Sequence, residues 1–147
     1  MAEEQRYGRR LPAGVVDSAF ASLATFIVGL SAVNLFDDVN RGVYAVYFTA
    51  FVAGTMLPRQ LIFTPAEVKA VSFDTDVRLS IIPESIRLAL GPAVVGTLGA
   101  GIAWVVTYSY ASPDVSAALL VTCAAAIVLS PIQDHVRKML HIATLSW

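Results

Sequence analysis

Long stretches without a charged side chain are the feature that most constrains the fold of this sequence. A helix needs about 20 mainly apolar residues to cross the hydrocarbon core of a bilayer. Four stretches meet this requirement once their flanking residues are included, and each predicts one membrane-spanning helix. The predicted spans cover about residues 14–36, 42–63, 88–111 and 115–132. We therefore expect an all-α, polytopic membrane protein with a single membrane domain over residues 1–147.

The composition agrees with a membrane protein and argues against other classes. Apolar residues make up 56% of the chain and charged residues 14%, against about 25% charged in an average soluble domain. The net charge of -1 gives no basic excess, so we expect no nucleic-acid partner. One cysteine and two histidines provide neither an internal disulfide nor a zinc cluster. We expect no enzyme activity, no cofactor and no metal.

Polar segments separate and follow the predicted spans. The second span is expected to continue through Pro58 and to stop at Thr64 and Pro65, because a proline disfavours helix at the residue before it. Residues 64–87 form a predicted connector between two pairs of helices. Residues 133–147 carry apolar side chains on one face at helical spacing. This tail is either an interfacial amphipathic helix or the start of a fifth span.

The basic residues indicate how the spans are oriented. If both termini and the connector lie on one side, nine basic residues fall on that side and one on the other. The nine are Arg6, Arg9, Arg10, Arg59, Lys69, Arg78, Arg87, Arg137 and Lys138, and the single exception is Arg41. Cytoplasmic segments of membrane proteins carry an excess of Lys and Arg. We therefore expect a multi-pass protein of the inner (cell) membrane with both termini in the cytoplasm.

Small residues recur at every fourth position in each predicted span. Helices in lipid associate through close backbone approach at small residues and through hydroxyl hydrogen bonds. Candidate packing residues are Ala21, Thr25 and Gly29 in the first span, Ala93, Thr97 and Gly101 in the third, and Ala118 and Thr122 in the fourth; the second offers Ala45, Thr49 and Ala53. The alternative is that these rows line a pathway through the membrane.

Arg59 and Gln60 are the candidate substrate-cavity residues. They follow Pro58 directly, where a proline inside a helix leaves a carbonyl unpaired and bends the axis. A charge within a span is costly unless it reaches the interface or faces a polar cavity. Arg59 therefore either extends to the inner interface or holds an anion in a cavity.

Asp134, His135 and Arg137 lie together just after the fourth span. A catalytic triad also needs a positioned nucleophile and an oxyanion hole, and no sequence motif here provides a nucleophile. We interpret these residues as solvated interfacial side chains that pair locally, for example Asp134 with Lys138 at i, i+4.

The order of features resembles the start of a known membrane family. Residues 17–47 read DSAFASLATFIVGLSAVNLFDDVNRGVYAVY, with Gly42, Val43 and Tyr44 opening the second span. The third span contains GPAVVGTLGAG, and the chain ends in SPIQDHVRKMLHIATLSW. Together with the polar connector, these segments resemble the first four helices of polysaccharide flippases in the multidrug, oligosaccharidyl-lipid and polysaccharide exporter superfamily.

The resemblance implies a function in transport. Members of that superfamily have twelve or more helices in two lobes and work by alternating access, and their cavities use basic side chains to hold substrate phosphates, which points to Arg59 here. With four helices, this chain is expected to be a fragment or partial lobe of a polysaccharide or lipid-linked oligosaccharide exporter. Its expected partners are the lipid bilayer, an anionic sugar-lipid or polysaccharide substrate, and further transmembrane helices or a partner subunit. The alternative is a small four-helix interaction or regulatory subunit without transport activity.

Overall fold

The computed structural model of the chain describes residues 19–20, 22–24, 26–31 and 33–142. The chain divides into two units, Met1–Arg41 and Gly42–Trp147, and each is described by itself. All regular structure among the described residues is helical, which confirms the predicted all-α class.

The first unit holds the described part of the first predicted span. Its described residues between 19 and 35 are helical, and the next helix, α2 (Asp38–Pro58), begins after Asp37. The Asp37 carboxylate accepts a hydrogen bond of 2.8 Å from the backbone N–H of Asn40, as an N-cap residue does. The predicted span 14–36 lies partly outside the described residues, so its length stays a prediction.

In the second unit, the second span is longer than predicted. Helix α2 continues without interruption into a π-helical turn, η1 (Arg59–Phe63), and then into α3 (Thr64–Ala70). The prediction that Thr64 and Pro65 end the helix is wrong. Pro65 comes just after the π-helical turn, and α3 continues through it to Ala70.

Helix α4 (Thr75–Thr107) contains the third predicted span but has different bounds. It begins thirteen residues before the predicted start at 88 and ends at Thr107 instead of 111. The predicted connector 64–87 is therefore mostly helical, and only residues 71–74 form a turn. The charged side chains of the early part, such as Glu84 and Arg87, lie on the exposed side of the helix, so they do not interrupt it.

Helix α5 (Pro113–Ile142) joins the fourth predicted span to the predicted tail. The sequence predicts a span at 115–132 and a distinct segment from 133. The described part of that segment, up to Ile142, continues the same helix through the buried Pro131. Residues 143–147 lie outside the described part of the chain.

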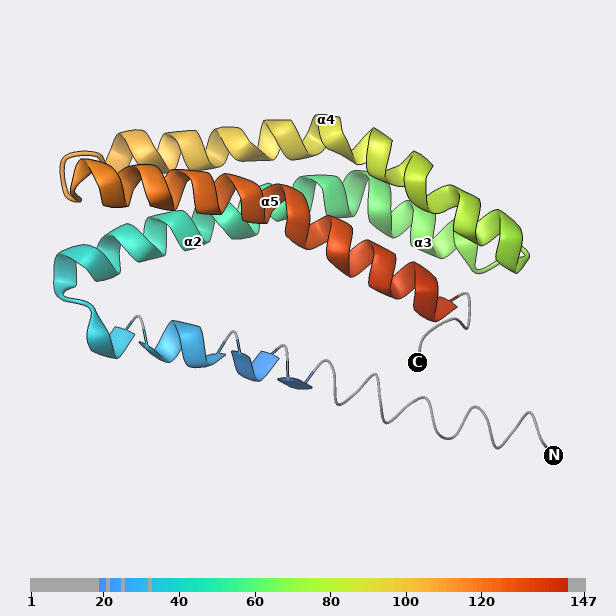
Figure 1. The fold of residues 1–147 in the computed structure, drawn as a ribbon, viewed down its shortest axis with the longest axis horizontal. Coiled ribbons are helices and arrows are strands. Elements are labelled where there is room, and N and C mark those ends of the chain that lie inside the picture. Colours follow the sequence, from blue (N-terminus) through green and yellow to red (C-terminus); the bar gives the residue numbers. More distant parts are fainter. Residues whose placement is uncertain (1–18, 21, 25, 32, 143–147) are drawn as a thin grey trace. The chain divides into compact units, whose positions relative to one another are not determined.

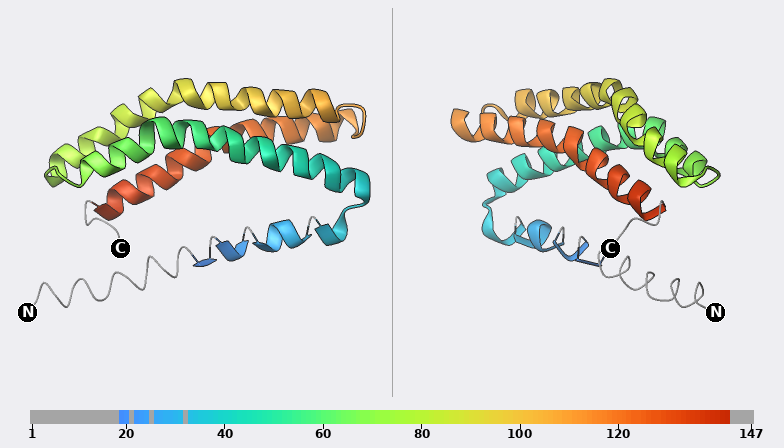
Figure 2. Two further views of the ribbon diagram at one scale, coloured as in Figure 1. Left: turned by 180° about the vertical axis from the view of Figure 1, so that it is seen from behind. Right: turned by 45° about the vertical axis from the view of Figure 1, so that its right-hand side comes forward.

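The contacts between α4 and α5 consist mainly of small side chains. The two helices lie side by side, with α2, η1 and α3 along them (Figures 1 and 2). The buried residues of α4 are Ser85, Ala89, Ala93, Gly96, Ala100, Ala103 and Thr107, and those of α5 are Ser116, Cys123, Ile127, Pro131, His135 and Met139. Large aliphatic side chains such as Leu98 and Val105 point outward instead, at 63% and 69% exposure. Small residues inside and large apolar residues outside are typical of helices that pack in lipid.

Two glycines allow α2 and α4 to cross in backbone contact. A Cβ atom added to Gly96 would lie 2.6 Å from the carbonyl oxygen of Gly54, and one added to Gly54 would lie 2.8 Å from Cδ1 of Ile127. Pro58 has no N–H to bond to the Gly54 carbonyl four residues earlier. A Cα–H of Gly96 occupies the Cβ position and so points at this oxygen, a contact worth about 0.5–1 kcal/mol. The crossing fixes the level at which α2, α4 and α5 meet.

Arg78, in the first turn of α4, hydrogen-bonds to the C-terminal ends of α3 and α5. Its guanidinium donates hydrogen bonds to the carbonyl oxygens of Ala70 (2.9 Å), Val71 (3.1 Å) and Ile142 (3.0 Å). These carbonyls lie at the C-terminal ends of α3 and α5. The last carbonyl oxygens of a helix have no N–H partner within that helix. A cation is also favoured at helix C-termini, so Arg78 caps two helices from a third.

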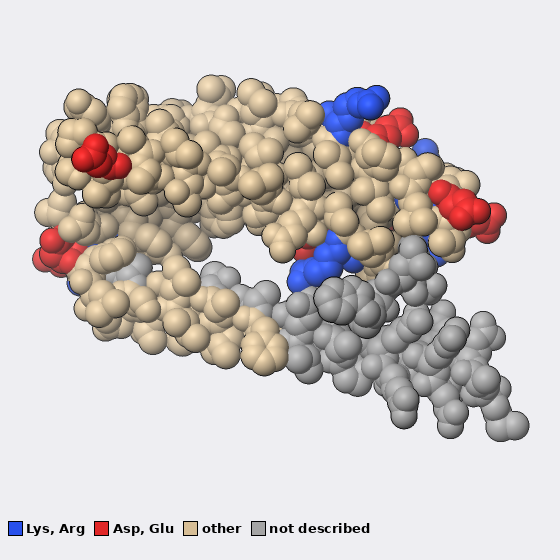
Figure 3. Space-filling view, in the orientation of Figure 1, with Lys and Arg blue, Asp and Glu red and all other residues tan. Residues whose placement is uncertain are grey.

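Three described helical segments are long and apolar enough to cross a membrane: Asp38–Ala70, Thr75–Thr107 and Pro113–Ile142. Most charged side chains lie toward the two ends of the visible face, and uncharged side chains cover most of its middle (Figure 3). This chain therefore has the features of a membrane protein. The count of four spans, the sides of the termini and the choice of membrane stay predictions.

Candidate functional site

His135 is a fully buried histidine with a polar partner on each ring nitrogen. Its Nε2 lies 2.8 Å from Oγ of Ser85 on α4, and its Nδ1 lies 3.0 Å from Oε1 of Glu67 on α3. Phe63 of the π-helical turn stacks on the imidazole, with ring centroids 4.4 Å apart and planes 18° apart. The side chain of His135 is 0% exposed and that of Glu67 16% exposed. Four consecutive elements thus meet at one ring.

Local sequence explains how these side chains meet. His135 belongs to the row Cys123, Ile127, Pro131, His135 and Met139, which recurs every four residues and faces inward. Ser85 opens the inward row of small residues on α4. The π-helical turn closes with the backbone N–H of Thr64 on the carbonyl of Arg59, one residue wider than an α-helical bond. This extra residue sets the register of Phe63 and of the following α3, which carries Glu67.

The hydrogen bonds of the site fit two protonation states. An ionised Glu67 only accepts, so Nδ1 of His135 donates to it. The Ser85 hydroxyl lies 2.8 Å from Nε2 and also 2.9 Å from the carbonyl oxygen of Ile82. In the neutral ring Ser85 donates to Nε2; in the cationic ring Nε2 donates to Ser85, and Ser85 donates to Ile82. Every polar atom keeps a partner in both states.

A set of ion pairs adjoins this buried cluster. Oδ2 of Asp134 is shared by Nζ of Lys138 at 3.0 Å and Nη2 of Arg59 at 3.3 Å, and Oδ1 accepts from Nη2 of Arg137 at 3.0 Å. Lys138 also lies 3.5 Å from Oε2 of Glu67. Lys138 therefore connects the carboxylate beside His135 to the carboxylate beside Arg59.

The sequence interpretation of this region is partly confirmed. Asp134 and Lys138 form the predicted i, i+4 pair. The prediction that His135 is a solvated interfacial residue is wrong, because the unbroken helix α5 turns it toward α3 and α4. A sequence signal existed, since His135 continues the i, i+4 row of Ile127 and Pro131, but the partners Glu67 and Ser85 are too distant in sequence to be paired by pattern.

The two predicted cavity residues lie at the π-helical turn. Arg59 has its side chain 52% exposed and forms an ion pair with Asp134 on α5. The sequence pattern is compatible with interfacial placement and with anion binding, and it does not reveal the pairing with Asp134. Gln60 is exposed. That these two residues line a substrate cavity stays a prediction.

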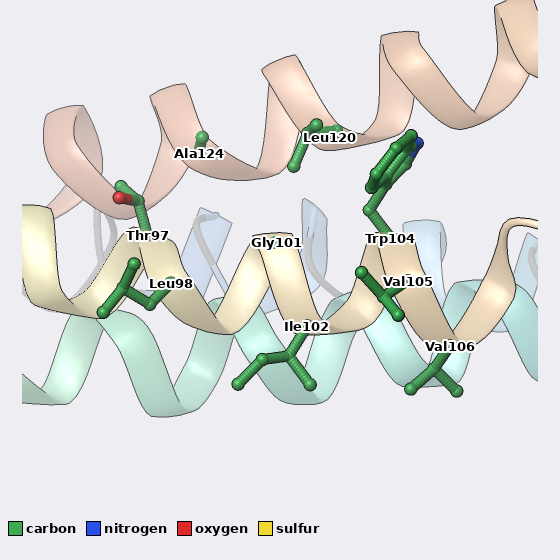
Figure 4. Close-up of a pocket in the computed structure, with 9 residues that line it drawn as sticks. All are labelled: Thr97, Leu98, Gly101, Ile102, Trp104, Val105, Val106, Leu120 and Ala124. Atoms are coloured by element: carbon green, nitrogen blue, oxygen red, sulfur yellow. The ribbon is translucent and has the colours of Figure 1, made fainter.

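The predicted packing residues take different places. Ala93 is buried between α4 and its neighbours at 3% exposure. Thr97 and Gly101 line an open apolar groove of about 660 Å³ together with residues of α5 (Figure 4). Ala118 and Thr122 are exposed on α5, so contacts within this unit are made by other residues. Gly29 lies in the first unit with open space at its Cβ position, and Ala21 and Thr25 lie outside the described residues.

The Ser85–His135–Glu67 geometry has the order of a catalytic triad but lacks other parts of one. Ser85 is only 3% exposed, and it lies within the continuous helix α4, whose backbone N–H groups are used in helical hydrogen bonds. No pair of N–H groups is therefore offered to an oxyanion beside this hydroxyl. The cluster therefore lacks the oxyanion site that a catalytic triad needs.

No three His, Cys, Asp or Glu side chains among the described residues are placed to hold a metal ion. Comparison with protein families, curated proteins and solved structures gives no match for this chain.

Proposed function

We propose that this chain is part of one lobe of a membrane exporter for polysaccharides or lipid-linked oligosaccharides, and that it works by alternating access. The proposal starts from the resemblance of residues 17–47 and of the later segments to polysaccharide flippases. It is consistent with three helices long and apolar enough to cross a membrane. No cofactor is part of the proposal.

The single observation that carries the proposal is the π-helical turn at Arg59–Phe63 and its ion pair with α5. A π turn inside an apolar helix is uncommon and is often found at functional sites. Here it follows Pro58 and places a cation, Arg59, 3.3 Å from a carboxylate on a neighbouring helix. Ionisable groups among membrane helices commonly mark the pathway of a substrate or ion.

In the Arg59–Asp134 ion pair, a substrate anion can replace the Asp134 carboxylate. Both side chains are partly exposed, at 52% and 26%, and ion pairs open to water contribute only about 0–1 kcal/mol. A phosphate or carboxylate of a substrate can therefore replace Asp134 at little cost, and Asp134 keeps Lys138 and Arg137 as partners. Arginine is well suited to this role because its planar guanidinium binds phosphate through two hydrogen bonds.

The proposed orientation follows from the same residues. The ends of the helices that carry Arg59, Lys69, Arg78, Arg137 and Lys138 face the cytoplasm, according to the excess of basic residues there. Both termini then lie in the cytoplasm, and the protein resides in the inner membrane. Arg59 accordingly meets its substrate from the cytoplasmic side.

The proposal is tested by exchanging Arg59 in the organism's own full reading frame. We expect Arg59→Ala to abolish the appearance of polysaccharide at the cell surface and to cause lipid-linked precursor to accumulate inside, while the protein still inserts into the membrane. Arg59→Lys should keep part of the activity, because it retains the charge without the two-pronged geometry. Arg87→Ala is the matched control, since Arg87 is exposed on α4. Normal export in Arg59→Ala would exclude this function for Arg59.

A second function is favoured by two open grooves. One, of about 420 Å³, lies between α2 and α4 and is lined by Ala45, Val46, Thr49, Ala50, Ala53, Gly99, Ile102, Ala103 and Val106. The other is the 660 Å³ groove of Figure 4. Grooves floored by small residues fit further transmembrane helices, as an interaction or regulatory subunit would require.

Co-purification in mild detergent separates the two functions. For a subunit, we expect a stoichiometric membrane partner that is lost in Gly101→Leu, because leucine fills the groove. Val94→Leu is the matched control, since Val94 is 61% exposed on the same helix and does not line the groove. A partner retained in both variants would count against docking in this groove.

A further inference from the structure

We infer that the Glu67–His135–Ser85 cluster is a proton-binding site, and that loading it with a proton releases Arg59 from Asp134. This inference deepens the proposed function, on which it rests, because it names the proton as the ion coupled to the anion site. It assigns a role to a buried histidine that anion binding alone does not use.

The first support is that the Ser85 hydroxyl has two alternative hydrogen-bond partners. Ser85 can reverse its hydroxyl between Nε2 of His135 and the carbonyl of Ile82, which lie 2.8 and 2.9 Å away. The proton therefore arrives without leaving any donor or acceptor unpaired, although an unpaired buried polar group costs about 1–3 kcal/mol. The site therefore has partners for both protonation states of the ring.

The second support is the charge that surrounds the ring. Glu67 of α3 contacts His135 directly, and Lys138 of α5 contacts the other oxygen of Glu67. The remaining Asp, Glu, Lys, Arg and His side chains on these elements are Arg59 of η1, Lys69 of α3, Asp76, Arg78, Glu84 and Arg87 of α4, and Asp114, Asp134, Arg137 and His141 of α5. Of these, Asp134 and Arg59 are joined to the site through Lys138. Glu67 thus accepts the Nδ1–H of the ring whether or not Nε2 carries a proton.

The third support is access. A groove of about 420 Å³ runs between the η1–α3 segment and α4, and Ser85 forms part of its wall. The same groove is lined by Lys69, Ser80 and Glu84, beside apolar residues of η1, α3 and α4. A proton can thus reach the buried ring through the Ser85 hydroxyl.

The coupling to Arg59 follows from the shared atoms. The ammonium nitrogen of Lys138 lies 3.5 Å from Oε2 of Glu67 and 3.0 Å from Oδ2 of Asp134. When His135 becomes cationic, Glu67 is neutralised by the ring, and Lys138 turns fully to Asp134. Lys138 and Arg59 bond to the same oxygen, Oδ2 of Asp134, so a stronger Lys138 bond weakens that of Arg59. Proton binding and anion binding then favour each other.

The test uses ¹⁵N-histidine-labelled full-length protein in lipid nanodiscs. NMR shifts of Nδ1 and Nε2 report which ring nitrogens carry a proton, with His135 assigned by the His135→Gln spectrum. We expect a proton on Nδ1 only at high pH and on both nitrogens after acidification within pH 5–9. A ring fixed in one state over this range would overturn the proton site.

Two serine variants test the hydroxyl. Ser85→Ala should change the His135 midpoint, because the cationic ring then lacks an acceptor for its Nε2–H. Ser80→Ala is matched, since Ser80 makes the same i−3 bond on the same helix but is exposed, and it should leave the midpoint unchanged. An unchanged midpoint in Ser85→Ala would remove Ser85 from the site.

Binding of inorganic sulfate, whose charge is constant over this pH range, tests the coupling. We expect at least about fivefold tighter binding on the acid side of the His135 midpoint, and no such gain in Lys138→Met. Sulfate binding that does not change across the midpoint would overturn the coupling. A ring that titrates normally while sulfate binds at no pH would support the proton site and overturn the anion site of the proposed function, so the two failures are distinct.

Discussion

Gly96 and Gly54 are in backbone contact, so close that a Cβ atom on Gly96 would lie 2.6 Å from the carbonyl oxygen of Gly54. Because that oxygen belongs to the main chain of another helix, a larger residue cannot be accommodated by a side-chain rotation. The two helices would have to separate, and Ile127 of α5 would lose its contact with the crossing.

We therefore predict that Gly96→Ala destabilises the protein by about 1–3 kcal/mol, as overpacking of a close contact does. Gly91→Ala is the control on the same helix, because nothing lies within 4 Å of its Cβ position. It should be neutral or stabilising by up to about 1 kcal/mol. Unfolding of the purified proteins in detergent measures both, and equal stability of the two variants would show that the helices do not cross in contact.

Arg78 offers a second test of the fold. Arg78→Ala removes three hydrogen bonds to carbonyl oxygens at the ends of α3 and α5, and we predict a loss of about 1.5–3 kcal/mol. Arg78→Lys should recover less than half of this loss, since one ammonium cannot match the spread of the three acceptors. Arg87→Ala should have little effect. The same unfolding measurement applies, and wild-type stability in Arg78→Lys would argue against the three-carbonyl cap.

Topology can be read from two exposed turns. In a Cys123→Ala background, which contains no other cysteine, we predict that Ser109→Cys reacts with a membrane-impermeant maleimide in intact cells. Ser72→Cys should react only after the cells are opened, because the turn at 71–74 lies at the basic end of the helices. Labelling of both positions from the same side would contradict the orientation.

Helix existence and type were predictable because the uncharged stretches are long and the hydrocarbon core allows little else. Helix ends were not. Asp76, Glu84 and Arg87 lie on an exposed face, and Arg78 bonds to the ends of α3 and α5, so these charges do not stop α4. Pro65 comes just after the π-helical turn and does not end the helix. Both effects depend on where the helix lies against its neighbours.

The site was predictable only in its local parts. The Asp134–Lys138 pair is set by helical spacing within one element. The contacts of His135 with Glu67 and Ser85 span 68 and 50 residues of sequence, and the π-helical register that aligns them is not visible in the pattern. Likewise, the contact of Gly54 with Gly96 depends on two helices meeting at one level, so neither glycine stands out from the others in the sequence.

The exchange of Asp134 for a substrate anion at Arg59 is tested most directly by calorimetry with pyrophosphate at one pH. Wild type, Asp134→Asn, Arg59→Ala and the control Arg87→Ala are compared as purified full-length proteins. We predict the tightest binding in Asp134→Asn, because Arg59, Arg137 and Lys138 then lose their shared carboxylate, weaker binding in wild type and Arg87→Ala, and none in Arg59→Ala. Equal affinity of Arg59→Ala and wild type, or no binding by Asp134→Asn, would contradict the exchange.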